Sequence, residues 1–178
     1  AEQRRISKMV NYALLYGKTA FSLAKDIGVS RKEAESFIAA YFARYPMVRT
    51  FIDETIAKAR ETGHVRTLLG RLRRLPDLRS KNFPVRMEAE RQAMNTPVQG
   101  SAADLVKQAM IDLDRALASR KMRSRLILQI HDELLLEVPE GEAEEVRALV
   151  KDVMEGALKL DVPLVADARL GRNWAEVH

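Results

Sequence analysis

The stretch LILQIHDELLLEVP, from Leu126 to Pro139, indicates a β-hairpin. Its two apolar runs, LILQI and LLLEV, would each make a buried strand, and His131, Asp132 and Glu133 lie between them. Polar residues are common at a hairpin tip that faces water. A tight turn would also hold a carboxylate rigidly at the end of a sheet, which suits metal binding. The hairpin alone leaves both interpretations open.

The composition is that of an ordinary globular protein, but the charge is unevenly distributed along the chain. Of the 178 residues, 47% are hydrophobic and 31% are charged, and the formal net charge is +5. Ten Lys or Arg residues stand against four acidic ones between Lys58 and Arg91, whereas five stand against twelve from Leu126 to the end. The basic middle indicates a surface that meets a polyanion, although solvated surface charge explains the composition equally well.

The sequence lacks cysteine and long apolar segments, and both absences indicate the cellular environment of the chain. There is no cysteine, which removes disulfides and thiolate metal sites and fits a reducing, cytoplasmic environment. No window approaches 18 uncharged apolar residues, so we expect no membrane contact.

Hydrophobic periodicity and capping residues predict a mainly helical chain with a few strands. Ser30 and Glu33 have the spacing of a capping box, and Pro97 and Gly100 are expected to kink or divide a long helical stretch. The predicted helices cover residues 3–15, 19–27, 31–44, 47–61, 85–120 and 141–158, and the predicted strands cover 65–69, 126–130, 134–138 and 162–170, with a basic loop over 70–84. This order indicates an α+β fold with a small antiparallel sheet. We expect Trp174 and the aromatic residues of the second and third helices to lie in the core.

The first predicted helix, RRISKMVNYALLYG (residues 4–17), has two contrasting faces. At about 100° per residue, one face is basic and aromatic and the opposite face is apolar. The first face carries Arg4, Lys8, Tyr12 and Tyr16, and the second carries Ile6, Met9, Val10 and Ala13. A solvated face of an amphipathic helix is the usual explanation of such a pattern. Two cations one turn apart could also bind a polyphosphate, and the tyrosines could stack on a base or sugar.

Three motifs in this chain resemble those of family A DNA polymerases, the bacterial DNA polymerase I type. The fingers-helix motif of that family, R-x-x-x-K-x-x-x-[FY]-G-x-x-Y-G, is similar to residues 4–17. The palm motif with its HDE turn is similar to QIHDELLLEVP, and the segment between the two is similar to MNTPVQGSAADL. The ending DARLGRNW also resembles the family's C-terminus, so the resemblance covers nearly the whole chain. It implies template-directed DNA synthesis, in replication or repair, by a helical fingers lobe (residues 1–84) and the C-terminal part of a palm (residues 85–178).

For the first helix, the resemblance implies binding of the incoming dNTP. Arg4 and Lys8 would bind the triphosphate, and Lys8 would also give a proton to the departing pyrophosphate. Tyr12 would pack against the sugar and base of the nucleotide. Tyr16 would lie beside the templating base and move aside as the fingers close.

The resemblance implies contacts with primer–template DNA for four further residues. Gln99 and His131 would touch the primer terminus in the minor groove, where the acceptors are common to all correct pairs. Arg91 and Asn95 would lie along the nearby template strand.

For the hairpin, the resemblance implies a metal site. Asp132 would be a ligand of two catalytic Mg²⁺ ions, and Glu133 would support that site. Mg²⁺ requires hard oxygen ligands, and two such ions stabilise both the attacking 3′-oxygen and the leaving pyrophosphate. In phosphoryl transfer, the protein contributes mainly by placing charges and by aligning the reacting groups. The resemblance therefore favours a metal ligand over a polar hairpin tip.

The chain departs from the family pattern in three respects. Ala13 stands where the family has glycine, and Tyr12 stands where many relatives carry Phe. The first palm motif, D-Y-S-Q-I-E-L-R, which supplies the other metal-binding aspartate, has no counterpart in these residues. We therefore expect the C-terminal portion of a monomeric polymerase that works with the rest of the polymerase chain, its thumb and N-terminal palm, and that is inactive by itself. The alternative is a catalytically inactive nucleic-acid-binding fragment.

Overall fold

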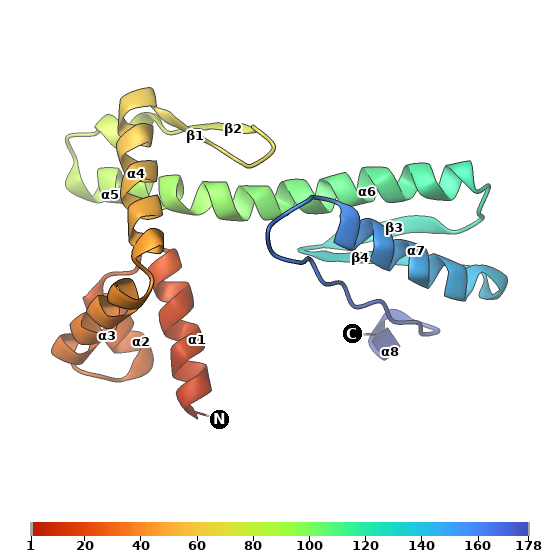
Figure 1. Cartoon of the computed structure of the whole chain (residues 1–178), viewed down its shortest axis with the longest axis horizontal. Coiled ribbons are helices and arrows are strands. Elements are labelled where there is room, and N and C mark those ends of the chain that lie inside the picture. The colour runs from red at the N-terminus through yellow and green to blue at the C-terminus, as the bar shows by residue number, and fades with distance from the viewer. Residues whose placement is uncertain (1, 178) are drawn as a thin grey trace. The chain divides into compact units, whose positions relative to one another are not determined.

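The computed structural model describes residues 2–177, which are mostly helical with two small antiparallel sheets (Figure 1). The residues form two compact units, one ending at Ser101 and the other beginning at Ala102. This is the α+β fold that the sequence predicted. The predicted boundary between fingers and palm, after residue 84, falls inside the first unit, and the division into these subdomains stays a prediction. No helix of the described part of the chain is long and apolar enough to cross a membrane.

Three helices at the start of the first unit pack around one apolar cluster. Helix α1 spans Glu2–Leu15, α2 spans Ala20–Ile27 and α3 spans Arg31–Arg44. The predicted apolar face of α1 meets buried residues of the other two helices, which confirms how this helix is oriented. The cluster consists of Ala13, Leu23, Ala24, Ile27 and Ala34, with Ile6, Met9 and Val10 packed against it.

The predicted capping box begins α3. The hydroxyl of Ser30 accepts the backbone N–H of Glu33 at 3.3 Å, and the Glu33 carboxylate accepts the backbone N–H of Ser30 at 2.9 Å. Two backbone donors that the first turn of a helix leaves unpaired are thereby satisfied. The hydrogen bonds from Ser30 also hold the pKa of the Glu33 carboxyl below its ordinary value.

The rest of the first unit is built around a second apolar cluster. Helix α4 spans Pro46–Thr62, β1 (His64–Arg66) pairs antiparallel with β2 (Leu72–Arg74), and α5 spans Phe83–Asn95. Small and aliphatic side chains from these elements and from a 3₁₀ turn at Pro76–Arg79 fill the space between them. The cluster consists of Ala59, Val65, Leu75, Leu78, Ala89 and Ala93.

The segment predicted as a basic loop, residues 70–84, contains regular structure, and that prediction is wrong for β2 and the 3₁₀ turn. The backbone turns at Gly70, whose φ is 82°, and the Thr67 N–H donates to the Arg71 carbonyl at 3.0 Å. A positive φ at glycine permits the tight turn that a hairpin needs. Arg73 and Arg74 therefore lie on a two-stranded ribbon, whereas Arg71 lies in its loop and Arg79 lies in the 3₁₀ turn.

Gly17 ends α1 and brings it against α5. Its φ is 68°, and the N–H of Lys18 donates to the carbonyl of Ala13 at 2.8 Å, in the pattern of a Schellman motif. A Cβ on Gly17 would lie 3.1 Å from Met94 Cε and 3.3 Å from Arg91 Cγ. The end of α1 is thus in close contact with α5, with no room for a side chain between them.

A π turn follows α5 where the sequence predicted a kink. It covers Thr96–Gly100, and α6 continues over Ser101–Ser119. Pro97 has no N–H and cannot donate to the carbonyl four residues earlier. The wider i→i+5 bonding of a π turn shifts the pairing by one residue, so the helical backbone continues through the proline.

The second unit packs two helices against one hairpin. Strand β3 (Arg125–Ile130) pairs with β4 (Glu133–Glu137), close to the predicted limits, and α7 spans Ala143–Gly156. Because Ile130 pairs with Glu133, His131 and Asp132 alone form the turn. The core consists of Leu113, Leu117, Val146, Leu149 and Val150, with Leu134 and Leu136 of β4 packed against it.

The predictions of a strand over residues 162–170 and of core positions for certain aromatic residues are wrong. Residues 162–170 form no strand, because no strand of the described residues pairs with them. The aromatic residues Phe21 of α2 and Phe37 of α3 are 71% and 42% exposed, and Trp174, at the start of the short helix α8 (Trp174–Val177), is 46% exposed. In α2 and α3 the buried positions are taken by smaller aliphatic residues, which allow the helices to approach closely.

Candidate active-site and DNA-binding residues

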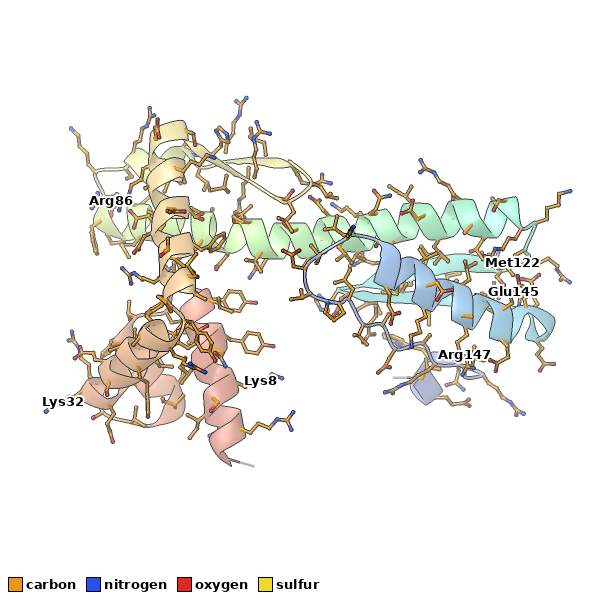
Figure 2. The ribbon with its side chains drawn as sticks, in the orientation of Figure 1. Lys8, Lys32, Arg86, Met122, Glu145 and Arg147 are labelled. Atoms are coloured by element: carbon orange, nitrogen blue, oxygen red, sulfur yellow. The ribbon has the colours of Figure 1, made fainter. Side chains whose placement is uncertain are left out.

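The basic and aromatic face of α1 is exposed to solvent. Arg4 and Lys8 are exposed, and so are Tyr12 (49%) and Tyr16 (40%). Figure 2 shows Lys8 projecting from α1 on the side away from α2 and α3. Within the described residues, neither Arg4 nor Lys8 forms an ion pair with a carboxylate. Both charges are therefore available to an anion.

The tyrosines of this face form a stack beside Lys8. The rings of Tyr12 and Tyr16 lie 6.2 Å apart between centroids, with their planes 9° from parallel. Lys8 Nζ lies 5.8 Å from the centre of the Tyr12 ring, within the range of a cation–π contact. Helical spacing of four residues produces this row. The face combines a flat aromatic surface with a cation, which suits a base or sugar that carries phosphates.

Arg91 lies on α5 and is bonded to a carboxylate one turn away. Its Nε donates to Glu88 Oε2 at 3.0 Å, and its Nη2 donates to the same oxygen. The hydrogen bond from Arg91 holds the pKa of the Glu88 carboxyl below its ordinary value, and a bond from Gln92 and the Arg91 charge add to this. A guanidinium has five N–H donors, so Arg91 retains donors for a phosphate while bonded to Glu88.

Asn95 and Gln99 differ in their surroundings. Asn95 Oδ1 is buried and is the one buried side-chain nitrogen or oxygen of the described residues that has no hydrogen-bond partner. A buried acceptor without a donor lowers the stability of the folded state, so the Asn95 amide would gain from a donor supplied by a ligand. Gln99 lies in the π turn with its side chain exposed.

The turn between β3 and β4 presents Asp132 to solvent. His131 has a left-handed backbone with φ 54°, which is uncommon for a residue other than glycine and is often found at functional sites. Gln129 Nε2 donates to the His131 carbonyl. Asp132 is exposed and forms no hydrogen bond or ion pair with another residue of the described part. The turn thus holds a carboxylate whose oxygens are uncommitted.

The donor set of this turn fits a hard cation but does not complete a metal site. The carboxylate oxygens of Asp132 are suitable ligands for Mg²⁺, and Glu133 follows at the start of β4 with its side chain exposed. No group of three or more His, Asp or Glu side chains among residues 2–177 is placed to hold a metal ion. The turn can therefore contribute to a metal centre that takes further ligands from elsewhere.

Two supporting side chains were not singled out from the sequence. Gln129 supports the turn through the His131 carbonyl, and Arg73 of β2 donates through Nη1 to Thr96 Oγ1 at 3.1 Å. The strand pattern marks Gln129 only as a polar residue, and Arg73 is one of several arginines in a segment that was expected to be a loop. The spacing of residues in the sequence could not reveal the hydrogen-bond partner of either Gln129 or Arg73.

The model of DNA polymerase family A matches residues 1–176, and the chain belongs to this family.

Individual relatives match over nearly all of this chain. DNA polymerase I of Pseudomonas aeruginosa is 50% identical over 177 residues, which cover 99% of this chain and 19% of that protein. The thermostable DNA polymerase I of Thermus filiformis is 50% identical over 175 residues, which cover 98% of this chain and 21% of that protein. The POL domain of Pol1 from M. smegmatis, solved with DNA primer-template and dNTP, has a TM-score of 0.95 and 46% identity, and the match covers 100% of this chain and 32% of that one. The chain thus spans about a fifth of the length of these curated relatives.

Proposed function

We propose that this chain serves template-directed DNA synthesis, in which a deoxynucleotide is transferred from a dNTP to the 3′-hydroxyl of a primer. In this proposal residues 1–84 are the fingers and residues 85–178 are the C-terminal part of the palm. The observation that carries the proposal is the exposed row on α1 of two stacked tyrosines and two cations that form no ion pair with a carboxylate of the described residues. Family membership supports it, because the matching relatives are DNA polymerases.

In the proposed reaction, α1 binds the incoming dNTP. Arg4 offers a planar fork of donors and Lys8 a compact charge, so the pair can hold two phosphates of the triphosphate. Tyr12 contacts the sugar and base, and Tyr16 lies beside the templating base. The Lys8 ammonium is also the proton donor to the departing pyrophosphate, which would otherwise leave with an extra negative charge.

Primer–template DNA is the second proposed substrate. Gln99 and His131 donate to minor-groove acceptors at the primer terminus, which all correct base pairs share. Arg91 and Asn95 contact the template strand, and the buried Asn95 Oδ1 without a donor is consistent with an amide that changes its partners when DNA binds.

Asp132 is the proposed metal ligand of this chain. Two Mg²⁺ ions, when bound, stabilise the attacking 3′-oxygen and the leaving pyrophosphate. Asp132 holds its carboxylate at the end of the hairpin, and Glu133 supports it from the first position of β4. The remaining ligands belong to the rest of the polymerase chain, which acts as a monomer in this proposal.

Primer extension tests the proposed function. A full-length polymerase that carries these residues should extend a primed template with dNTP and Mg²⁺, and a lack of template-dependent extension would contradict the proposal.

The second candidate function is that of a catalytically inactive nucleic-acid-binding fragment, and the incomplete metal site favours it for the 178 residues taken alone. We expect those residues to bind DNA weakly, with an affinity that falls steeply with salt, and to extend no primer. Mg²⁺-dependent extension by the 178 residues would rule out this second candidate.

A further inference from the structure

The π turn at Thr96–Gly100 is an uncommon backbone conformation with an exposed amide on it. π turns within α-helices are rare and occur frequently at functional sites. Gln99 is exposed here, and its neighbour Val98 is 56% exposed. The position of Gln99 is set by the contacts that hold the turn at its two ends.

Arg73 of β2 holds the beginning of the turn. Its Nη1 donates to Thr96 Oγ1 at 3.1 Å, and its Nη2 donates to Gln92 Oε1 at 2.9 Å. The Thr96 hydroxyl in turn donates to the Gln92 carbonyl at 2.6 Å. One guanidinium therefore bridges the last turn of α5 and the first residue of the π turn. Two of its donor nitrogens are bonded to protein, which is unlike a side chain kept free for phosphate.

The loop of the same hairpin holds the end of the turn. The backbone N–H of Leu68 donates to Ser101 Oγ at 2.8 Å, and the Ser101 hydroxyl donates to the Pro97 carbonyl. A Cβ on Gly100 would lie only 2.7 Å from Thr67 Cγ2. Thr67 is itself buried, so its methyl group packs directly on the backbone of Gly100.

We infer that the β1–β2 hairpin is a clamp that fixes the π turn, and that Arg73 is a positioning residue for Gln99 in the recognition of a correctly paired primer terminus. The inference rests on the proposed function, in which Gln99 donates to a minor-groove acceptor. Hydrogen bonds weaken steeply with misalignment, so only a rigidly held amide distinguishes an acceptor in its correct place from one that a mispair has displaced.

The neighbouring residue Arg74 provides a matched control. It lies next to Arg73 on β2 and is exposed, and its guanidinium has no hydrogen bond or ion pair within the described residues. Replacing either arginine by alanine removes one positive charge from the same strand. A general loss of DNA attraction therefore affects both variants alike, whereas a loss of positioning affects only Arg73→Ala.

The experiment compares extension from matched and mispaired primer termini by a full-length polymerase that carries these residues. The measured quantity is the ratio of kcat/KM for the next correct nucleotide on the two termini. We expect Arg73→Ala to lower this ratio about tenfold, the effect of about one well-placed hydrogen bond, and Arg74→Ala to leave it unchanged. Equal ratios in the two variants overturn the inference while leaving the proposed function intact. If the unaltered enzyme does not extend matched primers, the proposed function fails and the inference fails with it.

A double-mutant cycle shows whether Arg73 acts through Gln99. Gln99→Ala should lower the ratio by at least as much as Arg73→Ala, and the double variant should be no worse than Gln99→Ala alone. If the double variant instead shows the product of the two single reductions in the ratio, Arg73 and Gln99 act independently, which contradicts a positioning role.

The packing of Thr67 on Gly100 gives a second test that does not alter charge. Gly100→Ala introduces a Cβ against the Thr67 methyl group and should lower the ratio. Thr67→Ser removes that methyl group and keeps the hydroxyl, which accepts the Arg71 N–H at 3.0 Å. Thr67→Ser combined with Gly100→Ala should therefore restore the ratio. Unfolding temperatures of all variants are measured alongside. If the kcat/KM ratio of a variant depends on its unfolding temperature and not on which residues stand at positions 67 and 100, the inference is overturned.

Discussion

The carboxylate of Glu142 accepts the backbone N–H of Ser124 at 2.9 Å, and so joins the residue before α7 to the residue before β3. The same carboxylate accepts the Arg123 N–H at 2.9 Å. Hydrogen bonds from the Ser124 side chain, first, and from the Arg123 backbone hold the pKa of the Glu142 carboxyl below its ordinary value. The strand that leads to the HDE turn is therefore anchored at its beginning by an ionised side chain.

We expect this anchor to make stability depend on pH. Because the folded-state pKa of Glu142 is lowered, its contribution is present above the ordinary pKa of 4.5 and is lost as the pH falls through the lower folded value. Glu142→Gln should lower the free energy of unfolding at pH 7 and should make much less difference at pH 3. Denaturant unfolding of the protein at both pH values measures this. Glu140→Gln, an exposed residue of the same turn, is the control, and an equal effect of both substitutions would contradict the role of the anchor.

Asp132→Asn should abolish turnover while leaving DNA affinity nearly intact. The reason is that a metal-binding carboxylate acts mainly in the transition state, whereas DNA affinity depends on phosphate neutralisation. Single-turnover primer extension and equilibrium DNA binding measure the two quantities. Asp114→Asn on the exposed side of α6 should change neither. A near-normal kcat in Asp132→Asn would mean that the HDE turn is an ordinary polar hairpin tip.

Lys8→Ala should impair both nucleotide binding and rate. One cation serves the phosphates in the ground state and the pyrophosphate as it leaves, and a hydrogen bond to a charged group contributes about 1.5–3 kcal/mol. We therefore expect kcat/KM for dNTP to fall on the order of ten- to a hundredfold, with KM raised and kcat lowered. Lys25→Ala on α2 removes an exposed charge of the same unit and should have little effect. A change in KM alone would remove Lys8 from the proton-transfer step.

Tyr12→Phe should restore discrimination against dideoxynucleotides. The Tyr12 hydroxyl can supply a hydrogen-bonding group beside the nucleotide sugar, so a missing 3′-hydroxyl leaves less polar surface unpaired. A substrate that leaves polar groups of the site unpaired can be disfavoured by several powers of ten in kcat/KM. We therefore expect Tyr12→Phe to raise the preference for deoxynucleotides about a hundredfold or more. The measurement is the ratio of kcat/KM for a deoxynucleotide and its dideoxy analogue. Tyr45→Phe, remote in sequence and also exposed, should leave that ratio as it was, and an unchanged ratio in Tyr12→Phe would remove Tyr12 from the sugar pocket.

Local signals in the sequence predicted most of the elements, but not the contacts between them. The spacing of Ser30 and Glu33 was sufficient to place the start of α3, because a capping box involves only neighbouring residues. The prediction for 162–170 failed because a local sequence pattern cannot supply the partner strand that a ladder requires.

The candidate site shows the same division between local and distant information. Helical spacing alone placed Lys8, Tyr12 and Tyr16 on one exposed face of α1. The bond between Arg91 and Glu88 was not anticipated, and the clamp formed by Arg73 depends on a hairpin that the arginine-rich sequence did not reveal. The roles of the individual residues in synthesis stay predictions.

Because there is no room for a side chain between Gly17 and Met94, a tilt of α1 together with α2 and α3, which pack on it, would pivot about the C-terminal end of α1. At about 1.5 Å per residue, Arg4 lies about 20 Å from this pivot and Lys8 about 13 Å. A tilt of the helix about Gly17 therefore sweeps Arg4 through an arc about one and a half times as long as that of Lys8, while Tyr16 stays almost still. The end of α1 that carries Arg4 would therefore move farthest, and the end that carries Tyr16 would stay beside Gly17.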